Sequence, residues 1–345
     1  MINRWISILL VSASVQTCLA QNCDEQLNTA QRAYYDGNLN LAISSIERCV
    51  SNNQFSREDQ EAALKLLINS YLILNEDSLA DSAMANLLNQ FPLTRVRSTD
   101  LVEFKRLHGA YDIRPKINFG IQVGFNSPDF EVMQYRSYAS FREEPSDYRT
   151  TIAPSVGVSG DYAILKNLFV SLGLIYQNHQ LSFNEILLDL QELRVRESIH
   201  SLHTPLLLKY VVNFEPVSFF AAAGVSGSFI LSSKADLTLF ELDREFPPPI
   251  FGNSGQEEDY TLTFQRRALN FNYALGAGIQ KQFGFYALEA GIYYDYGLNN
   301  LVKTSERYSE EFLLQKFSYV PDDFKMNHYR FTVGIYRTIF KSEKR

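Results

Sequence analysis

The sequence is poor in several features that mark other classes of protein. It has one Trp and three Cys in 345 residues, and its net charge of −7 leaves no excess of Lys and Arg. Because nucleic-acid-binding chains gather positive charge, no nucleic-acid partner is expected. It contains no Gly-rich phosphate loop, no metal-ligand spacing and no paired-carboxylate motif, so we predict no cofactor, no metal and no enzyme activity. Tyr and Phe, by contrast, number 20 and 25, and alternating aromatic residues favour β-strands.

Residues 1–20 are predicted to form a signal peptide. Arg4 supplies a positive charge, Ile6 to Val15 form a short apolar segment, and Ala20 fits a cleavage position. The apolar segment is too short to span a membrane as a helix. A lipoprotein would instead require acylation of Cys18, but the three residues before it make a poor lipobox. We therefore expect export, with cleavage after Ala20.

Cleavage there leaves two cysteines, Cys23 and Cys49. An even pair in an exported protein favours a disulfide. The alternative is two independent, small buried residues. We predict the disulfide, because the segments that carry the two cysteines are expected to be neighbouring antiparallel helices. Neither cysteine lies in a Cys or His cluster, which argues against a metal site.

Apolar residues at helical spacing predict a helical domain over residues 21–112. The expected helices cover 24–36, 39–52, 57–75 and 77–90, and Pro92 ends the last of them. Ser98-Thr99-Asp100, followed by Glu103, resembles an N-cap for a fifth helix that reaches about Tyr111.

Within this domain, the antiparallel helix pairs resemble tetratricopeptide repeats. The resemblance covers about 70 residues, and two units are fewer than a free-standing repeat array needs. It implies a groove that binds a peptide or protein; the alternative is a helical cap that only spaces the next domain. The matching residues are Tyr34, Gly37, Ala42 and Ile46 in the first unit, and Tyr71, Ala80, Leu87 and Pro92 in the second.

From Lys116 the period of the apolar pattern changes from 3.6 to 2. In the first such segment, Ile117 to Phe125, every second residue is apolar and the residues between them are Asn, Gly and Gln. Similar segments predict eight antiparallel strands, which form a β-barrel over 115–341. The expected strands are 117–125, 152–162, 168–178, 202–212, 217–231, 269–279, 286–296 and 329–339.

The connections between the expected strands alternate in length. Tight turns are expected near Lys166, Glu215 and Gly284, and long loops over 127–148, 180–199, 232–262 and 298–327. Segment 180–199 is either a short amphipathic piece or an extension of the strands. Membrane barrels have short periplasmic turns and long external loops, so both ends of the barrel are expected in the periplasm.

A soluble barrel would also show alternation, with its apolar residues inside. Four features favour a transmembrane barrel: the export signal, strands with aromatic ends, alternating loop lengths, and a small polar inner face. The fold class is therefore α+β multidomain: a periplasmic, tetratricopeptide-like helical domain, then an eight-stranded barrel surrounded by outer-membrane lipid.

The segment Pro205 to Tyr210, Pro-Leu-Leu-Leu-Lys-Tyr, resembles a strand of PorT-like outer-membrane β-barrel proteins of Bacteroidota. The final segment Tyr329 to Phe340 resembles a barrel-closing strand, although Lys341 to Arg345 follow it. The resemblance implies an outer-membrane location and brings no catalytic residues.

The inner face carries two charges that the strand positions place at similar depth, Lys209 and Glu289. Because an eight-stranded barrel encloses room for side chains only, we predict that they form an ion pair in the lumen; the alternative is an ion path. His179, His200 and His203, with Ser198 or Ser201, are the candidates for a lipid-modifying barrel enzyme, but no nucleophile motif surrounds them.

The leading hypothesis from the sequence is a non-enzymatic outer-membrane anchor, which presents the helical domain to a periplasmic or envelope protein partner in an envelope or secretion-associated role. The alternatives are a small channel or transport component and a lipid-modifying enzyme.

Overall fold

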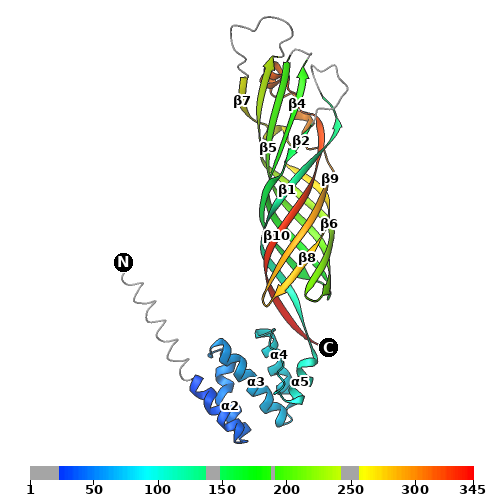
Figure 1. The fold of residues 1–345 in the computed structure, drawn as a ribbon. Helices are drawn as coiled ribbons and strands as arrows, with labels where there is room; N and C mark the ends of the chain where they lie inside the picture. Colours follow the sequence, from blue (N-terminus) through cyan, green and yellow to red (C-terminus); the bar gives the residue numbers. More distant parts are fainter. Residues whose placement is uncertain (1–22, 137–147, 188–190, 242–255) are drawn as a thin grey trace, which may run out of the picture. The chain divides into compact units, whose positions relative to one another are not determined.

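The computed structural model describes residues 23–136, 148–187, 191–241 and 256–345 (Figure 1). The predicted signal peptide lies outside the described residues, as do Pro247 to Gly255 in the predicted loop 232–262. The chain divides into two compact units. Unit 1 is Met1–Pro115 with Phe340–Arg345, and unit 2 is Lys116–Ile339.

Unit 1 is helical because its apolar residues recur at helical spacing and its helices have local caps. The side chain of Asn38 accepts a hydrogen bond from the N–H of Leu41, and that of Ser56 accepts one from Asp59. Residues in the left-handed conformation, among them Gly37 and Asn75, end helices and turn the chain back. The helices are 23–35, α2 (Leu39–Ser51), α3 (Arg57–Ile73), α4 (Asp77–Gln90) and α5 (Val102–Gly109).

Cys23 and Cys49 form a disulfide that joins the first helix to α2, as the sequence predicts, with their Cα atoms 6.0 Å apart. Both cysteines belong to the hydrophobic core of the unit, in which Ile46, Leu64 and Leu87 are fully buried.

The expected N-cap of the fifth helix is wrong. Helix α5 starts at Val102, after Leu101, and has no side-chain cap. The Asp100 carboxylate instead accepts a hydrogen bond from the N–H of Arg97, 2.6 Å away, and so stabilises the turn before the helix. The chain then becomes a strand at Tyr111, inside the range that the sequence assigns to the helical domain.

Unit 2 is an antiparallel sheet that closes on itself (Figure 1). Hydrogen-bonded neighbours run in the order β4-β3-β1-β10-β9-β8-β6-β5, and β5 pairs with β4. The strands are β1 (Tyr111–Gln134), β2 (Arg149–Thr151), β3 (Ala153–Ala163), β4 (Leu168–Leu187), β5 (Gln191–Phe214), β6 (Val217–Glu241), β7 (Gln256–Thr261), β8 (Leu269–Phe283), β9 (Tyr286–Gly297) and β10 (Asp323–Lys344).

The sheet differs from the sequence prediction in strand number and strand length. Among the described residues it has ten strands: eight form the closed path, and the short strands β2 and β7, which we did not predict, pair with β4 and β6 outside that path. Segment 180–199 is an extension of the strands, since Leu187 pairs with Gln191 at the tip of the β4–β5 hairpin. Strand β6 likewise runs to Glu241, into the predicted loop 232–262.

The longer strands have a physical cause that strand β5 illustrates. Every second residue from Leu193 to Lys209 is buried, so the same face points inward throughout. Near the turn end the inward residues include Lys209 beside apolar Leu207, and the outward ones, such as Leu208, are apolar, as lipid requires. Between Gln191 and His200, the part of β5 further from the turn, apolar residues point inward and charged residues point outward. Leu193 and Val195 are buried and Arg194 is exposed, as in a barrel surrounded by water. The apolar pattern expected of a lipid-facing strand therefore stops where the outer surface changes.

The inside of the water-facing part holds its own hydrophobic core, which includes Leu193, Phe324 and Phe317. Phe317 belongs to a short helix, α6 (Glu311–Phe317), in the connection before β10. Two 3₁₀ turns, Thr263–Gln265 and Thr304–Glu306, also lie in connections at this end. No helix among the described residues is long and apolar enough to cross a membrane.

Candidate functional site

The inner face of the barrel is the candidate site, because it gathers buried charges from strands far apart in the sequence. The layer nearest the short turns holds Lys209 on β5, Asp161 on β3 and Glu289 on β9, all at most 5% exposed. The Lys209 ammonium lies 2.9 Å from the Asp161 carboxylate and also contacts Glu289. The two residues singled out in the sequence thus meet, together with a second carboxylate, Asp161, which the sequence analysis did not name as a site residue.

Aromatic side chains fill the space around this layer. The Lys209 ammonium lies 4.5 Å from the centre of the Phe220 ring. The Tyr293 hydroxyl donates a 3.4 Å hydrogen bond to Glu289, and the Tyr336 hydroxyl is hydrogen-bonded to Ser159 at 2.8 Å. Side chains therefore occupy the interior at this level.

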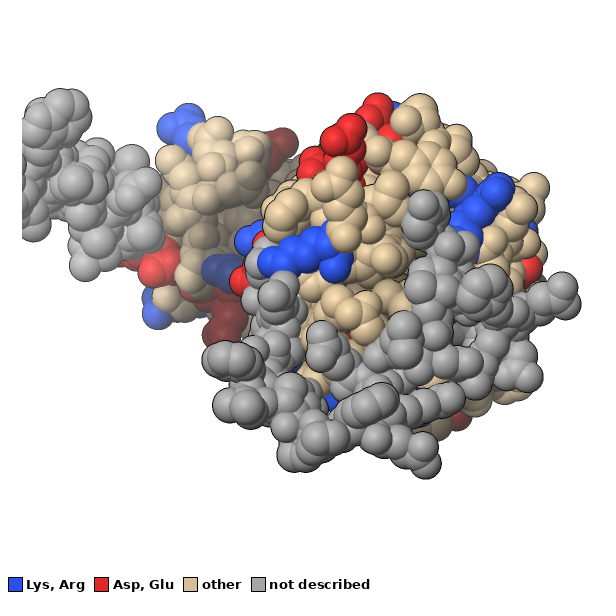
Figure 2. Space-filling view, turned by 90° about the horizontal axis from the view of Figure 1, so that it is seen from above, with Lys and Arg blue, Asp and Glu red and all other residues tan. Residues whose placement is uncertain are grey.

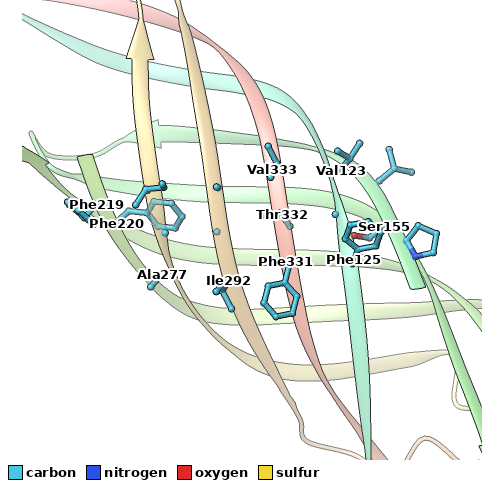
Figure 3. A pocket seen from close by; sticks show the side chains of 17 residues that line it. Val123, Phe125, Ser155, Phe219, Phe220, Ala277, Ile292, Phe331, Thr332 and Val333 are labelled. Atoms are coloured by element: carbon cyan, nitrogen blue, oxygen red, sulfur yellow. The ribbon is translucent and has the colours of Figure 1, made fainter. Parts of the chain in front are cut away.

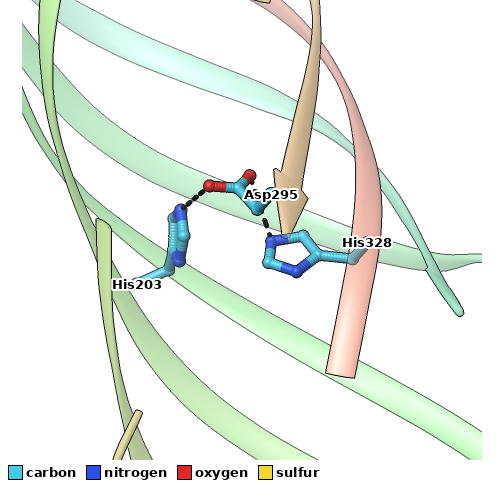
Figure 4. Close-up of side chains that lie close together, drawn as sticks. All are labelled: His203, Asp295 and His328. Atoms are coloured by element: carbon cyan, nitrogen blue, oxygen red, sulfur yellow. Dashed lines mark ion pairs between the residues drawn. The ribbon is translucent and has the colours of Figure 1, made fainter. Parts of the chain in front are cut away.

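A second buried layer lies further along the barrel and centres on Asp295 of β9 (Figure 4). His203 and His328 lie on either side of its carboxylate, with Nε2 atoms 3.4 Å and 3.3 Å from its oxygens. The Arg330 guanidinium lies 3.5 Å away and above the ring of Tyr293. Neither Asp295, His328 nor Arg330 was identified from the sequence as a site residue, although Asp295 and Arg330 fall on the polar face of predicted strands.

Hydroxyl groups orient this second layer. Ser226 donates a 2.8 Å hydrogen bond to Asp295, and Ser228 is hydrogen-bonded to Nδ1 of His203 at 3.0 Å. The ring of His179, which is hydrogen-bonded to Ser201, lies edge-on to the His328 ring with centroids 5.3 Å apart. The three imidazoles and the carboxylate are fully buried.

The histidines named as candidates for an enzyme do not form one group. His179 and His203 point into the barrel and are fully buried. His200 points outward, where its Nδ1 lies 2.6 Å from the hydroxyl of Tyr176 and Ser198 lies 3.4 Å from its Nε2. A serine and histidine set shared by all three therefore does not exist.

A third layer lies inside the water-facing part of the barrel. The Arg266 guanidinium is paired with Glu197, which also accepts a hydrogen bond from Ser233. All three side chains are at most 2% exposed. Arg307 pairs with Asp323 in the connection that leads into β10. Above these groups the hydrophobic core around Phe324 packs against α6.

The outer surface carries a different kind of feature, an apolar groove of about 980 Å³ (Figure 3). Its lining is formed mainly by outward-facing apolar side chains, among them Val123, Phe219 and Phe331. It lies on the part of the barrel whose exterior is apolar, and Ser155 and Thr332 are the polar side chains in its lining.

The surface of unit 2 at its water-facing end carries both positive and negative side chains. Figure 2 shows Lys and Arg beside Asp and Glu on the described surface, in small groups of each sign. One exposed pair is Arg194 with Glu192, at 2.9 Å. This surface therefore presents no large field of one sign among the residues that the structure describes.

A protein-family model agrees with the barrel architecture of unit 2. A family model described as "outer membrane protein beta-barrel domain" matches residues 110–303. Among solved structures, the chain is similar to the outer membrane protein OprG from Pseudomonas aeruginosa, at 12% identity and a TM-score of 0.36, over 65% of this chain and 97% of that one. It is also similar to the outer membrane protease OmpT from Escherichia coli, at 10% identity and a TM-score of 0.37, over 66% of this chain and 98% of that one.

A third solved structure, the attachment invasion locus protein Ail of Yersinia pestis, is 14% identical with a TM-score of 0.27, over 64% of this chain and 99% of that one. No curated protein matches the chain.

Proposed function

The chain belongs to the outer membrane protein beta-barrel domain family, and from this premise we propose that it is a closed outer-membrane anchor that presents its helical unit to an envelope protein in the periplasm. The observation that carries the proposal is the packed interior. Three successive layers of buried, mutually paired charges occupy the barrel, where a conducting pore would need a continuous path of water.

The direction of the strands supports a periplasmic helical unit. Near the start of β1, Ile117 pairs with Tyr162, just before the short turn that precedes β4. Near the end of β10, Arg337 pairs with Tyr286, just after the turn at Gly284. Both ends of the barrel sequence therefore lie at the short-turn end, which is the periplasmic end in membrane barrels of this kind.

The helical unit supports a role in protein binding. Its helices alternate along the chain with short connections, and the Tyr, Gly and Ala positions of the first four match the tetratricopeptide pattern noted in the sequence. Large apolar side chains are exposed on it, among them Tyr35 at 85% and Val102 at 73%.

We further propose that the chain is not an enzyme. The half-buried His200 has hydroxyl neighbours but, among the described residues, no buried carboxylate that would orient it, and His203, which has both, is fully enclosed. A reacting group needs access to substrate, which His203 lacks.

Site-specific photocrosslinking in cells tests the anchor proposal. A photoreactive residue at Tyr35 of the full-length chain is expected to give a discrete crosslinked protein, identified by mass spectrometry. The same residue at Ile121, which is 64% exposed on the lipid-facing surface, is the control and should give none. Failure of positions Tyr35, Leu79 and Val102 alike to capture a protein would contradict the proposal.

A further inference from the structure

The second layer contains donor atoms that the barrel leaves unused. Nε2 of His203, both ring nitrogens of His328 and Oδ2 of Asp295 are buried without a hydrogen-bond partner. Burying a polar atom unpaired costs free energy, and here several such atoms lie together.

We propose that His203, Asp295 and His328 bind a divalent first-row transition-metal ion inside the barrel. One ligand atom from each residue lies within 4.8 Å of the others. Two atoms bound to one tetrahedral zinc at about 2.0–2.1 Å are about 3.3 Å apart. Each imidazole has that spacing to a different oxygen of the carboxylate: Nε2 of His203 lies 3.4 Å from Oδ1 of Asp295, and Nε2 of His328 lies 3.3 Å from Oδ2. Imidazole and carboxylate are ligands that suit zinc and its neighbours.

The surroundings supply the outer contacts that metal ligands need. Ser228 is bonded to Nδ1 of His203, so that Nε2 remains to face the site. Ser226 holds the Asp295 carboxylate and in turn accepts a hydrogen bond from Asn272 at 3.2 Å. Hydrogen bonds of this kind fix the orientation and the tautomer of metal ligands. His179, whose Nδ1 is buried and unpartnered, lies beside His328 as a third imidazole.

Charge balance also favours a cation. With all carboxyls ionised, the first two layers together hold Asp161, Glu289 and Asp295 against Lys209 and Arg330. Carboxyl groups therefore outnumber the Lys and Arg side chains by one in these two layers. Arg330 faces the same carboxylate and limits the excess of negative charge, which distinguishes the site from an acidic cluster.

The test uses the full-length chain, folded in detergent. After equilibration with Zn²⁺ and removal of free ion, the wild-type protein is expected to retain about one zinc per chain by elemental mass spectrometry. His328→Gln and Asp295→Asn should weaken binding by more than the roughly 10–100-fold that loss of an outer contact costs. The matched control His200→Gln removes an imidazole on the outer face of the same strand as His203 and should retain zinc.

Cobalt provides a readout that does not depend on the variants folding. Co²⁺ bound to wild-type protein by His203, Asp295 and His328 should give the intense visible absorption of a four-coordinate site, which added Zn²⁺ abolishes. No retained zinc and no such absorption in the folded wild-type protein would overturn the proposal. Equal zinc retention in the wild type, the control and the folded His328→Gln variant would overturn it too, because the ion would then bind elsewhere.

Discussion

Lys209 and Glu289 are eighty positions apart in the sequence and in contact inside the barrel, where Lys209 also reaches Asp161. Their strands, β5 and β9, are not neighbours in the sheet, so the contact crosses the lumen. A side chain that joins opposite walls both occupies the interior and ties the strands together.

Lys209→Met should destabilise the barrel by about 3–5 kcal/mol, because it leaves two buried carboxylates without their cation. Urea-induced unfolding in lipid vesicles measures this loss of stability. The fraction of folded protein is monitored by its gel mobility, which does not depend on tryptophan fluorescence. The triple variant Lys209→Met, Asp161→Asn, Glu289→Gln removes all three charges and should recover a large part of the loss. A single variant as stable as the wild type would show that these groups are not coupled.

The Cys23–Cys49 bond closes a segment with a sequence separation of 26. Its removal by Cys23→Ser with Cys49→Ser should destabilise the helical unit by about 3 kcal/mol, through the greater chain entropy of the unfolded state, and leave the barrel folded. Circular dichroism in the helical region during thermal unfolding measures the first effect, and heat-dependent gel mobility of the barrel measures the second. Loss of barrel folding in this variant would contradict the division into two units.

Gly124 on β1 has no room for a larger side chain. A Cβ at this position would meet the carbonyl oxygen of Phe331 on β10 at 1.9 Å, and backbone cannot move aside cheaply. Gly124→Ala should therefore reduce the yield of folded barrel sharply. The control is Gly160→Ala on β3, where the nearest atom is at 3.3 Å and a small shift suffices. Equal yields of the two variants would show that β1 and β10 do not approach so closely.

The last residues of the chain belong to the helical unit. Lys344 pairs with Asp81 of α4 at 2.7 Å, and the Tyr111 hydroxyl donates to the same carboxylate at 2.8 Å. Burial and Asp81 raise the pKa of Tyr111 to about 12. The hydrogen bond from Lys344 holds the pKa of Asp81 below its usual value. The contact therefore stabilises the unit fully at a pH above the usual pKa of an Asp side chain, and this stabilisation is lost as the pH falls through the lowered pKa.

Because the Asp81–Lys344 pair is largely exposed, its contribution should be no more than about 0.5 kcal/mol. Asp81→Asn is expected to lower helical-unit stability slightly at neutral pH and to have no effect in acid below the pKa of Asp81. Thermal unfolding at the two pH values measures the difference. A variant effect that is larger in acid would show that the sign of this pKa shift is wrong.

The orientation of the barrel predicts which segments are reachable from outside the cell. An epitope tag near Gly252, between β6 and β7 in the sequence, should be labelled by antibody on intact cells. A tag in the turn at Gly284 should be labelled only after the outer membrane is permeabilised. The reverse pattern would place the helical unit outside the cell.

The sequence was informative wherever one physical rule governed a segment. Alternation identified the lipid-facing strands, and Ile121 is exposed and Gln122 buried as expected. The parts of β5 and β6 furthest from their shared turn were not predicted as strands, because the outer surface there meets water. Arg194 points out and Leu193 points in. Polar and apolar residues still alternate there, but the apolar residues face the inside of the barrel and the polar residues face outward.

The site shows a similar limit. The depth of Lys209 and Glu289 along their strands could be counted from the turns, so their contact was predictable. The group of His203, Asp295 and His328 depends on which strands face one another across the closed barrel and on side chains near the start of β10. His328 directly precedes the predicted strand 329–339, so no pattern placed it inside.

The central claim is that side chains close the barrel, and single-channel recording tests it most directly. Purified full-length protein in a planar lipid bilayer is expected to show no steady ohmic openings, because the layers at Lys209, Asp295 and Glu197 fill the interior. Regular, voltage-independent conductance steps from the folded wild-type protein, lost on its unfolding, would contradict the account and make the chain a channel.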